Sequence, residues 1–278
     1  MRRTTPPSFP FPLTNLSSHS PSTTFKKHQE PPMTTPPRII ATLVVLAVLA
    51  FTSLHGAFAD PTGATILSNT TAGQPSSTAG NRTDAGGTIT TLTISAVQQN
   101  NRWKAYVGNV SGRLSLDNAA GFTIYDWELS GGAIAGEVYV TRYSSITFSN
   151  LSCGNVGNIT AESTYMNMTT TQVDGINRTF NYTDHRAITV GTIPPVTLNA
   201  DTCPSTATYV NDSRQNMTGT QAYDQVITQD PSSRVVFIGI INDNTGGYDN
   251  SPYDFQMIVP ENAANATPTT YYFFTELS

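Results

Sequence analysis

The sequence has 278 residues, of which only 12% are charged, and its formal net charge is -5. From Asp60 onward, 18 acidic residues stand against nine basic ones, and Lys104 is the only lysine. This balance argues against nucleic acid as a partner, because phosphate binding needs clustered Lys and Arg side chains. The low charge, with abundant Thr, Ser, Asn and Gly, is typical of an extracellular β protein and not of a cytosolic enzyme.

The N-terminal region contains the pattern of an exported protein. Ile39 to Leu54 is an apolar run of signal-peptide length, shorter than the roughly 20 residues that a membrane-spanning helix needs. Ala57-Phe58-Ala59 follows with the small-x-small pattern of a cleavage site. We expect Met33 to be the true initiator, which makes residues 33–59 the signal peptide and residues 1–32 a gene-model extension. An uncleaved signal anchor is the alternative.

Residues 60–87 are rich in Thr, Ser, Gly and Asn and are predicted to form a flexible linker. A β-rich domain is predicted over residues 88–278. It begins with Thr88 to Val97, in which Leu92, Ile94 and Ala96 alternate with polar residues as in a half-buried strand.

Arg102 to Leu129 holds both tryptophans and the clearest strand–turn–strand pattern of the chain. Asp117 to Gly121 is the predicted turn, and it leads into Phe122 to Leu129. The alternation of residue types predicts a β-meander with one buried aromatic face and one mostly polar face. The aromatic face of its last strand would carry Tyr125, Trp127 and Leu129, and the polar face Asp126 and Glu128.

The remaining elements are short. Arg234 to Ile241 is a continuous apolar run, which predicts a central strand covered on both faces. Thr160 to Asn167 is the predicted helix, with Thr160 as N-cap, and Asp174-Gly175 is a weak hairpin signal. Further strands are expected at Gly136 to Phe148, Arg178 to Tyr182, Ala187 to Val190, Val196 to Leu198, Tyr253 to Val259 and Thr270 to Leu277.

Many short strands with frequent turn signals predict an all-β fold, specifically a single antiparallel β-sandwich of jelly-roll or immunoglobulin-like type with one short helix. Cys153 and Cys203 are the only cysteines. In an exported chain they are expected to form one disulfide. It would close a loop of about 50 residues and stabilise the fold by roughly 4 kcal/mol on the chain-entropy model.

The pattern Asn-x-Ser/Thr recurs eleven times after Asp60, whereas composition alone would give roughly five matches to this N-glycosylation motif. The excess predicts a glycoprotein, in a host that glycosylates. The candidate sites are Asn69, Asn81, Asn109, Asn150, Asn158, Asn167, Asn177, Asn181, Asn211, Asn216 and Asn265.

No catalytic residue is assigned from the sequence. After residue 59 there is a single histidine, His185. One histidine argues against a Ser-His-Asp triad and against a zinc site. A carboxylate pair remains as a glycosidase alternative, since Asp126 and Glu128 share one strand face. A solvated strand face explains these two residues more simply.

Two binding functions are weighed against structural explanations. The polar loop at residues 242–254 offers oxygen ligands of the kind that Ca²⁺ prefers, although its spacing does not match an EF-hand; the candidate ligands are Asp243, Asn244, Asp249 and Asp254. Exposed aromatic side chains could stack on sugar rings, but core packing is their commoner role. The candidates for this carbohydrate face are Trp103, Trp127, Tyr139 and Tyr143.

Several motifs together resemble a group of uncharacterised archaeal secreted proteins, over most of residues 88–278. The resemblance implies export, surface residence and a β-rich body, and it carries no activity to any residue. The motifs are Trp103-Lys-Ala-Tyr-Val-Gly-Asn-Val-Ser-Gly, Ile124-Tyr-Asp-Trp127, Gly136-Glu-Val-Tyr139, Tyr253-Asp-Phe-Gln-Met-Ile-Val-Pro-Glu261 and Thr270-Tyr-Tyr-Phe-Phe.

The leading hypothesis is a secreted cell-surface glycoprotein with a structural, assembly or adhesion role, such as a coat or filament subunit. Its partners would be copies of itself or other surface proteins, and no transmembrane anchor is expected in the mature chain. A sharper version has residues 63–97 donate a strand to a neighbouring subunit. The alternatives are a carbohydrate-binding module and a secreted glycan-active enzyme.

Overall fold

A computed structural model describes residues 60–128 and 134–278 of the chain. The predicted extension (1–32) and signal peptide (33–59) lie outside these residues, as does Leu129. The described residues fall within one structural unit, His55–Ser278.

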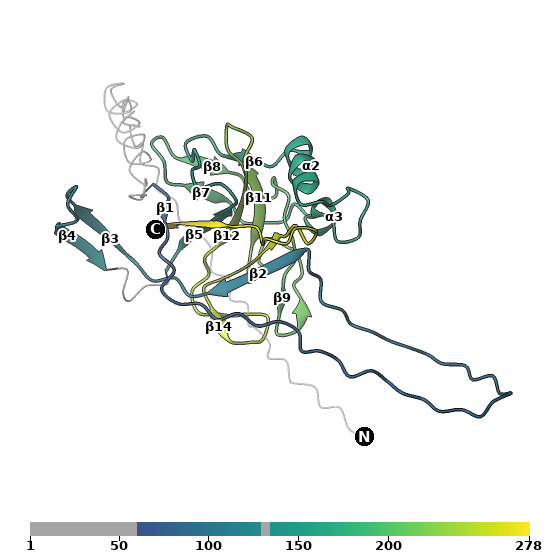
Figure 1. Ribbon diagram of the computed structural model, residues 1–278. Helices are drawn as coiled ribbons and strands as arrows, with labels where there is room; N and C mark the ends of the chain where they lie inside the picture. Colours follow the sequence, from purple (N-terminus) through teal and green to yellow (C-terminus); the bar gives the residue numbers. More distant parts are fainter. Residues whose placement is uncertain (1–59, 129–133) are drawn as a thin grey trace, which may run out of the picture. The chain divides into compact units, whose positions relative to one another are not determined.

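The largest sheet of the described chain has six strands, and every neighbouring pair in it is antiparallel (Figure 1). Its central strand β12 bears the apolar run that was predicted to be covered on both faces. This prediction is confirmed, because Val235 and Phe237 join one buried cluster while Val236 and Ile238 join another. The strand order is β1 (Thr62–Gly63), β16 (Tyr272–Leu277), β5 (Gly136–Thr141), β12 (Val235–Ile240), β11 (Gln225–Gln229) and β6 (Ser152–Cys153).

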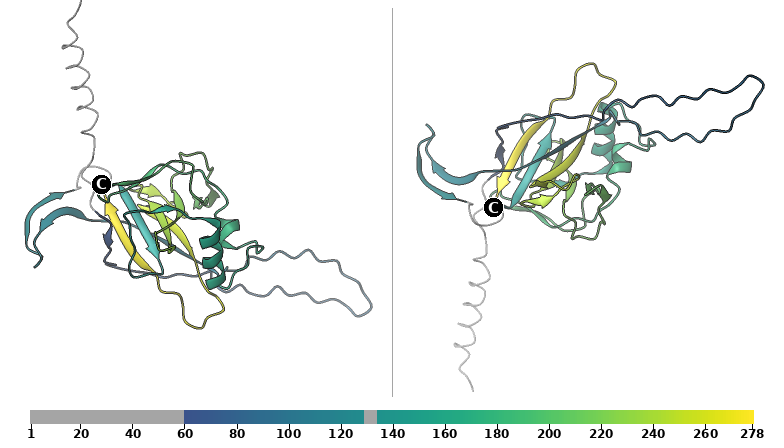
Figure 2. Two further views of the ribbon diagram at one scale, coloured as in Figure 1. Left: turned by 90° about the horizontal axis from the view of Figure 1, so that it is seen from above. Right: turned by 90° about the horizontal axis from the view of Figure 1, so that it is seen from below.

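One face of this sheet is covered by a two-stranded sheet and two helices, which surround the first core cluster. Tyr106 of β2 packs edge-on against Phe273 of β16, with ring centroids 4.9 Å apart. Met257 and Val259 of β15 are fully buried in the same cluster. The covering elements are β2 (Trp103–Gly108), β15 (Phe255–Pro260), α2 (Val156–Tyr165) and α3 (Ile176–Thr179). Figure 2 gives two further views of these elements.

The opposite face carries the second core cluster, in which Ile188, Val190 and Leu198 pack with residues of β5 and β12. These three side chains come from the hairpin β7 (Ile188–Val190) and β8 (Val196–Leu198). The other described strands form three hairpins: β3 (Arg113–Asp117) with β4 (Thr123–Glu128), β9 (Tyr209–Val210) with β10 (Ser213–Arg214), and β13 (Thr245–Gly246) with β14 (Pro252–Tyr253).

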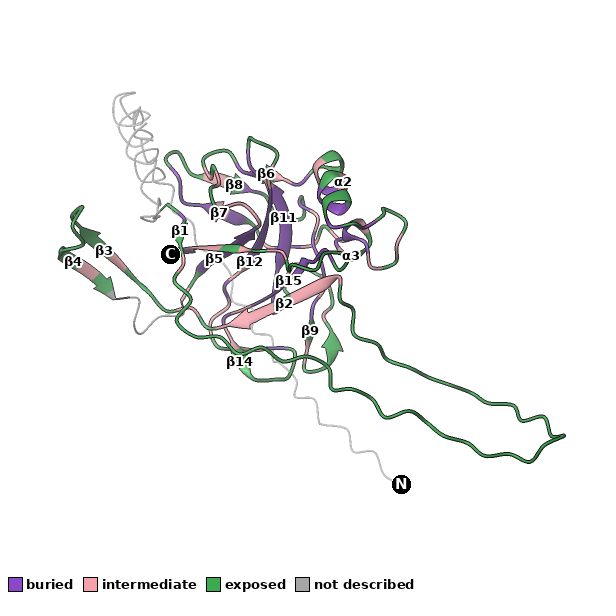
Figure 3. Cartoon of the chain, viewed as in Figure 1, coloured by how far each residue is buried: buried purple, intermediate pink, exposed green. Residues whose placement is uncertain are grey.

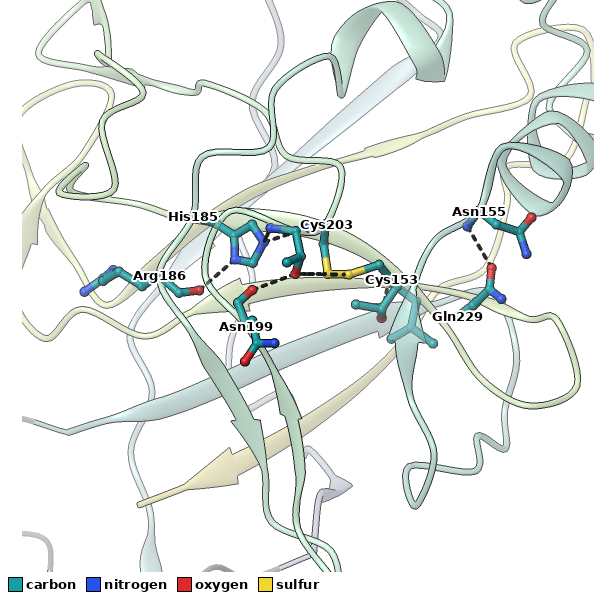
Figure 4. The surroundings of a disulfide bond; sticks show 10 residues. Cys153, Asn155, His185, Arg186, Asn199, Cys203 and Gln229 are labelled. Atoms are coloured by element: carbon teal, nitrogen blue, oxygen red, sulfur yellow. Dashed lines mark hydrogen bonds between the residues drawn. A yellow bond between two sulfur atoms is a disulfide. The ribbon is translucent and has the colours of Figure 1, made fainter.

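The predicted disulfide is present, and it joins Cys153 of β6 to Cys203 across a sequence separation of 50 residues. His185 is fully buried beside it (Figure 4). Its Nε2 accepts hydrogen bonds from the backbone N–H groups of Thr202 (3.1 Å) and Cys203 (2.8 Å), so its Nδ1 carries the proton and donates to the Arg186 carbonyl at 2.7 Å. His185 is therefore a structural residue that holds the segment before Cys203.

The prediction of a mostly β fold is confirmed, but the predicted meander is wrong. β2 does not pair with β3; it pairs with β15, so that Tyr106 lies opposite Met257. β3 and β4 do form a hairpin with each other around the predicted turn. Local alternation defines the faces of a strand, but it does not define the partner along its edge.

Three further elements differ from expectation. The helix α2 exists, but it begins four residues before Thr160, because the Asn155 side chain caps it by accepting from the Asn158 N–H. A second helix, α3, occupies the start of the predicted strand at 178–182, with Gly175 as its N-cap instead of a hairpin turn. Thr88 to Val97 forms no strand, whereas Thr62–Gly63, within the predicted linker, does.

Two buried carboxylates lie directly opposite each other, Glu137 on β5 and Glu276 on β16. Glu276 accepts the Tyr139 hydroxyl (2.8 Å) and the Gly191 backbone N–H (2.7 Å). Burial, followed by the negative charge of Glu276, raises the pKa of Glu137 to about 8. Burial also raises the pKa of Glu276, despite its two donors. Glu137 therefore keeps its proton at neutral pH in the folded protein.

The double variant Cys153→Ser/Cys203→Ser should lower the free energy of unfolding by about 4 kcal/mol, because it frees a long loop in the unfolded chain. Urea denaturation of the variant measures this loss, and reduced wild-type protein is its control. Equal stability of the oxidised wild type and the variant would contradict the assignment.

Stability should also fall as pH rises from about 4.5, the ordinary pKa of a Glu side chain, to about 8. In this window the unfolded chain releases the Glu137 proton and the folded chain retains it, so unfolding is favoured by up to about 1.4 kcal/mol per pH unit. Glu137→Gln should remove this part of the slope. Urea denaturation across the window tests it, and identical slopes in variant and wild type would refute it.

Candidate functional site: an exposed arm and an exposed hairpin

Residues 65–101 form a long arm in which every residue is exposed (Figure 3). The arm contains large apolar side chains that contribute to neither core cluster. Ile89 is 99% exposed and Ile94 83%, which is unusual for side chains of this type. Ile66, Leu67, Leu92 and Val97 are exposed in the same way. We use "the arm" for residues 65–101 below.

The N-terminal end of the arm is anchored by the main sheet. Thr62 and Gly63 pair with Thr275 and Phe274 of β16, and the Ala64 N–H donates to the Phe273 carbonyl at 2.9 Å. Residues 60–64, which were predicted to belong to a flexible linker, are thus an edge strand and its flanks.

The C-terminal end of the arm is anchored by Asp174, in the loop before α3. Its carboxylate accepts from Asn100 Nδ2 (3.2 Å) and Arg102 Nη1 (3.3 Å), and its carbonyl accepts from Trp103 Nε1 (2.8 Å). The Trp103 ring lies 6.2 Å from that of Phe180, between centroids. We call these contacts the Asp174 clamp. They fix the point at which the arm leaves β2.

Between the two anchors, Thr88–Val97 has the pattern of a strand without the partners of one. Leu92, Ile94 and Ala96 would share one face of an extended chain, with Thr91, Thr93 and Ser95 on the other. Residues 89–97 make no backbone–backbone hydrogen bond within the described part of the chain. The segment also carries no charged residue, so it is patterned as a strand but has no strand partner among the described residues.

The β3–β4 hairpin is a second exposed apolar element. Leu114 lies opposite Trp127 and Leu116 opposite Tyr125, so these four side chains share one face. Tyr125 is 60% exposed and Trp127 51%, with ring centroids 5.0 Å apart. The predicted burial of this aromatic face is therefore wrong for the described residues: the hairpin exists, but the described part of the chain leaves the face exposed.

The carboxylate pair suggested for glycoside hydrolysis lies on the other face of this hairpin. Asp126 Oδ2 accepts from Arg113 Nη1 at 2.7 Å in an ion pair that is open to solvent. Glu128 ends β4, and its side chain lies outside the described part of the structure. Asp126 thus has the environment of a solvated strand face.

Three of the four candidate calcium ligands, Asp243, Asp249 and Asp254, accept hydrogen bonds from protein groups with their carboxylate oxygens. Asp254 is buried; its Oδ2 accepts the Val110 N–H (2.7 Å) and its Oδ1 the Asn244 N–H (2.9 Å). Asp243 Oδ2 accepts from Asn244 Nδ2 at 3.1 Å, and Asp249 accepts the Tyr253 hydroxyl at 3.2 Å. No group of three or more His, Cys, Asp or Glu in the described ranges is placed to hold a metal ion. Calcium at this loop stays a prediction.

The four aromatic residues proposed for a carbohydrate face are not brought together. Tyr139 is fully buried in the second cluster, while Trp103 belongs to the Asp174 clamp. Tyr143 stacks on the Arg142 guanidinium, 4.3 Å from its ring centroid, and Trp127 lies on the exposed hairpin. Core packing and clamp contacts explain the first two without a ligand.

Nine of the eleven candidate glycosylation sites are exposed, and two are not. Asn158 is half-buried, and its Nδ2 donates to Gln229 Oε1 at 2.9 Å. Asn177 is half-buried as well, with its Oδ1 enclosed. A glycan attached to Nδ2 of Asn158 would have to break the hydrogen bond to Gln229, and one attached to Asn177 would have to be accommodated beside an enclosed Oδ1.

The sequence does not reveal the Asp174 clamp or the role of His185, because a single Asp or His in a polar loop forms no recognisable pattern. The chain matches no protein-family model, no curated protein and no solved structure. Among the described residues, no helix combines the length and apolar character needed to cross a membrane.

Glycopeptide mass spectrometry of the native protein should find Asn158 and Asn177 unmodified and sugar at the exposed sites, because the side chains of Asn158 and Asn177 are half-buried in the fold. Asn150 and Asn181, both exposed, are the matched controls near these two residues in the sequence. Full occupancy at Asn158 or Asn177 would contradict the packing described above.

Proposed function

We propose that this protein is an exported cell-surface glycoprotein that acts structurally, as a subunit of a coat or filament built from copies of the same chain. The observation that carries the proposal is the arm: it is exposed throughout and anchored at both ends, and it contains the uncharged, strand-patterned segment Thr88–Val97. Export is supported by the predicted signal peptide and is consistent with the disulfide.

A solitary folded chain gains nothing from such an arm. Exposed apolar side chains with unpaired backbone groups promote pairing with another chain, and proteins without that function usually cover or shorten such segments. Strand addition uses both features, since main-chain hydrogen bonds give affinity and alternate side chains give specificity. The arm is therefore the donor in the assembly that we propose.

Assembly would also account for the two-stranded β2–β15 sheet over the main sheet. A donated strand would extend this second layer toward the two-sheet β-sandwich that the strand pattern predicts. The exposed hairpin β3–β4 offers a further apolar face for contacts between subunits, independent of the arm.

A carbohydrate-binding module is the second candidate, and one observation favours it. A pocket of about 330 Å³ has Tyr165, Tyr272 and Arg142 among its lining residues, and the Arg142 guanidinium carbon lies 3.8 Å from the Tyr165 ring centroid. Aromatic side chains with a few polar groups are the usual lining of a small-ligand pocket, and aromatic rings can stack on sugar rings.

If this pocket binds sugar, Tyr165→Ala should abolish binding in a glycan array, whereas Tyr125→Ala on the β3–β4 hairpin should not.

Electron microscopy of the mature protein taken gently from native cell surfaces tests the structural proposal. We expect filaments or lattices, with peptide masses confirming the chain. Discrete monomers at all concentrations would contradict assembly and would favour the carbohydrate-binding module.

The double variant Leu92→Asp/Ile94→Asp should raise the concentration needed for assembly about a hundredfold or more, because two apolar side chains would no longer be buried between subunits. Light scattering measures that concentration. Thr91→Asp/Thr93→Asp adds the same charge on the other face of the segment and should have a smaller effect. Equal assembly by both variants would exclude the arm as donor.

A further inference from the structure

β2 is the outer strand of the layer that covers the first core cluster. It pairs with β15 along one edge, and within the described residues no strand pairs with its other edge. Arg102 and Glu261 lie opposite each other just beyond the β2–β15 ladder, and the Glu261 N–H donates to the Arg102 carbonyl at 2.7 Å. These two residues are therefore a hydrogen-bonded pair of the ladder. Because such pairs alternate along an antiparallel ladder, the backbone groups of Trp103, Ala105 and Val107 point to the unpaired edge.

Other sheet edges near the core are closed or short. Along the far edge of β15, the buried side chain of Gln225 takes the place of a strand: its Nε2 donates to the Ile258 carbonyl (2.5 Å) and its Oε1 accepts the Ile258 N–H (2.8 Å). The outer strands of the main sheet, β1 and β6, have two residues each. Natural proteins protect their edges in these ways. The six-residue edge of β2 has no such protection in the described structure.

The side chains beneath this edge are only partly covered. Tyr106 of β2 and Phe273 of β16 contact each other and belong to the half-buried margin of the first cluster. Ala105, on the opposite face of β2, is exposed. A strand added beside β2 would gain backbone partners and cover apolar margin residues in one step.

The arm of the same chain is not placed to supply that strand. Thr88–Val97 is separated from β2 by residues 98–102, so a hairpin onto the chain's own edge would need these five residues to form its loop. The Asp174 clamp holds Asn100, Arg102 and Trp103 in another arrangement, and residues 88–101 are exposed instead of packed along β2. A second copy of the chain has no such constraint.

We propose that the unpaired edge of β2 is the acceptor for Thr88–Val97 of a second copy, with Leu92, Ile94 and Ala96 directed to the margin at Tyr106 and Phe273. This inference rests on the proposed function and specifies the partner of the arm. Neither the donor segment nor β2 contains a glycosylation motif. The nearest, Asn109, directly follows the last residue of β2 and would mark one end of the acceptor.

Cysteine cross-linking between differently tagged copies tests the pairing. The two native cysteines are joined in the disulfide, so engineered cysteines provide the reactive thiols. One copy carries Thr93→Cys, the other Ala105→Cys, and a short bismaleimide is added to the assembled mixture. We expect a mixed-tag dimer, and a much lower yield when Ser115→Cys, on the exposed hairpin, replaces Ala105→Cys.

The outcomes separate the inference from the proposed function. Assembly with cross-linking to Ser115→Cys alone would make the hairpin the acceptor, overturning this inference and leaving the structural role intact. If a chain with both Thr93→Cys and Ala105→Cys links only within itself at high dilution, the strand closes on its own edge and the inference also fails. If wild-type chains do not assemble at all, the proposed function itself fails.

A backbone variant gives a second measurement. Ala105→Pro removes an N–H group from the unpaired edge without touching the ladder to β15. It should raise the concentration needed for assembly at least about tenfold, while the melting temperature of the monomer changes little; Ala105→Ser keeps the N–H and should assemble like wild type. Normal assembly by Ala105→Pro would overturn the proposed pairing.

Discussion

The fold depends on one requirement: β12 is apolar on both faces, and both faces must be covered. Val235 and Phe237 need one covering layer, and Val236 and Ile238 need another. Pairing with β5 and β11 satisfies the backbone of the strand but leaves both faces of the sheet apolar. The β2–β15 sheet with the two helices covers one face, and the β7–β8 hairpin covers the other. The disulfide and His185 hold the chain close to this second cover.

The main sheet and its two covering layers contain the described elements that bury the core. The arm and the β3–β4 hairpin are not part of these layers. This division explains which sequence predictions succeeded. Where a segment faces the core, its alternation or continuous apolar run identified it, as for residues 234–241 and 196–198. Where the pattern was equally clear but no strand partner lies among the described residues, as for residues 88–97, propensity predicted a strand that the structure does not contain. Alternation describes what a segment can bury and not where it does so.

The pairing of β2 with β15 could not be predicted for a related reason. Their closest residues in sequence are separated by most of the domain, and several other segments offer the same alternation. What selects β15 is the shape of the first core cluster and a set of single polar side chains. Gln225 closes the far edge of β15, Asp254 receives the N–H of Val110 just after β2, and Asp174 holds the start of β2. Gln225 and Asp254 bind backbone groups that a strand would otherwise pair with, whereas Asp174 holds side chains at the start of β2. Isolated Gln and Asp residues give no pattern in sequence.

The positions of donor and acceptor along the chain have a mechanical consequence for the assembly we propose. The donor segment precedes its own β2 by only five residues, and β2 would receive the donor of the next copy. Tension along a row of subunits would then pass from the donated strand of one subunit to the β2 strand of the subunit that accepts it. Within the accepting subunit it would pass through the Asp174 clamp into that subunit's own donor segment. The main sheet and its disulfide would lie beside this path instead of within it. Such an arrangement lets each subunit fold and close its core before assembly, because the segments that join subunits are the ones that the core does not use.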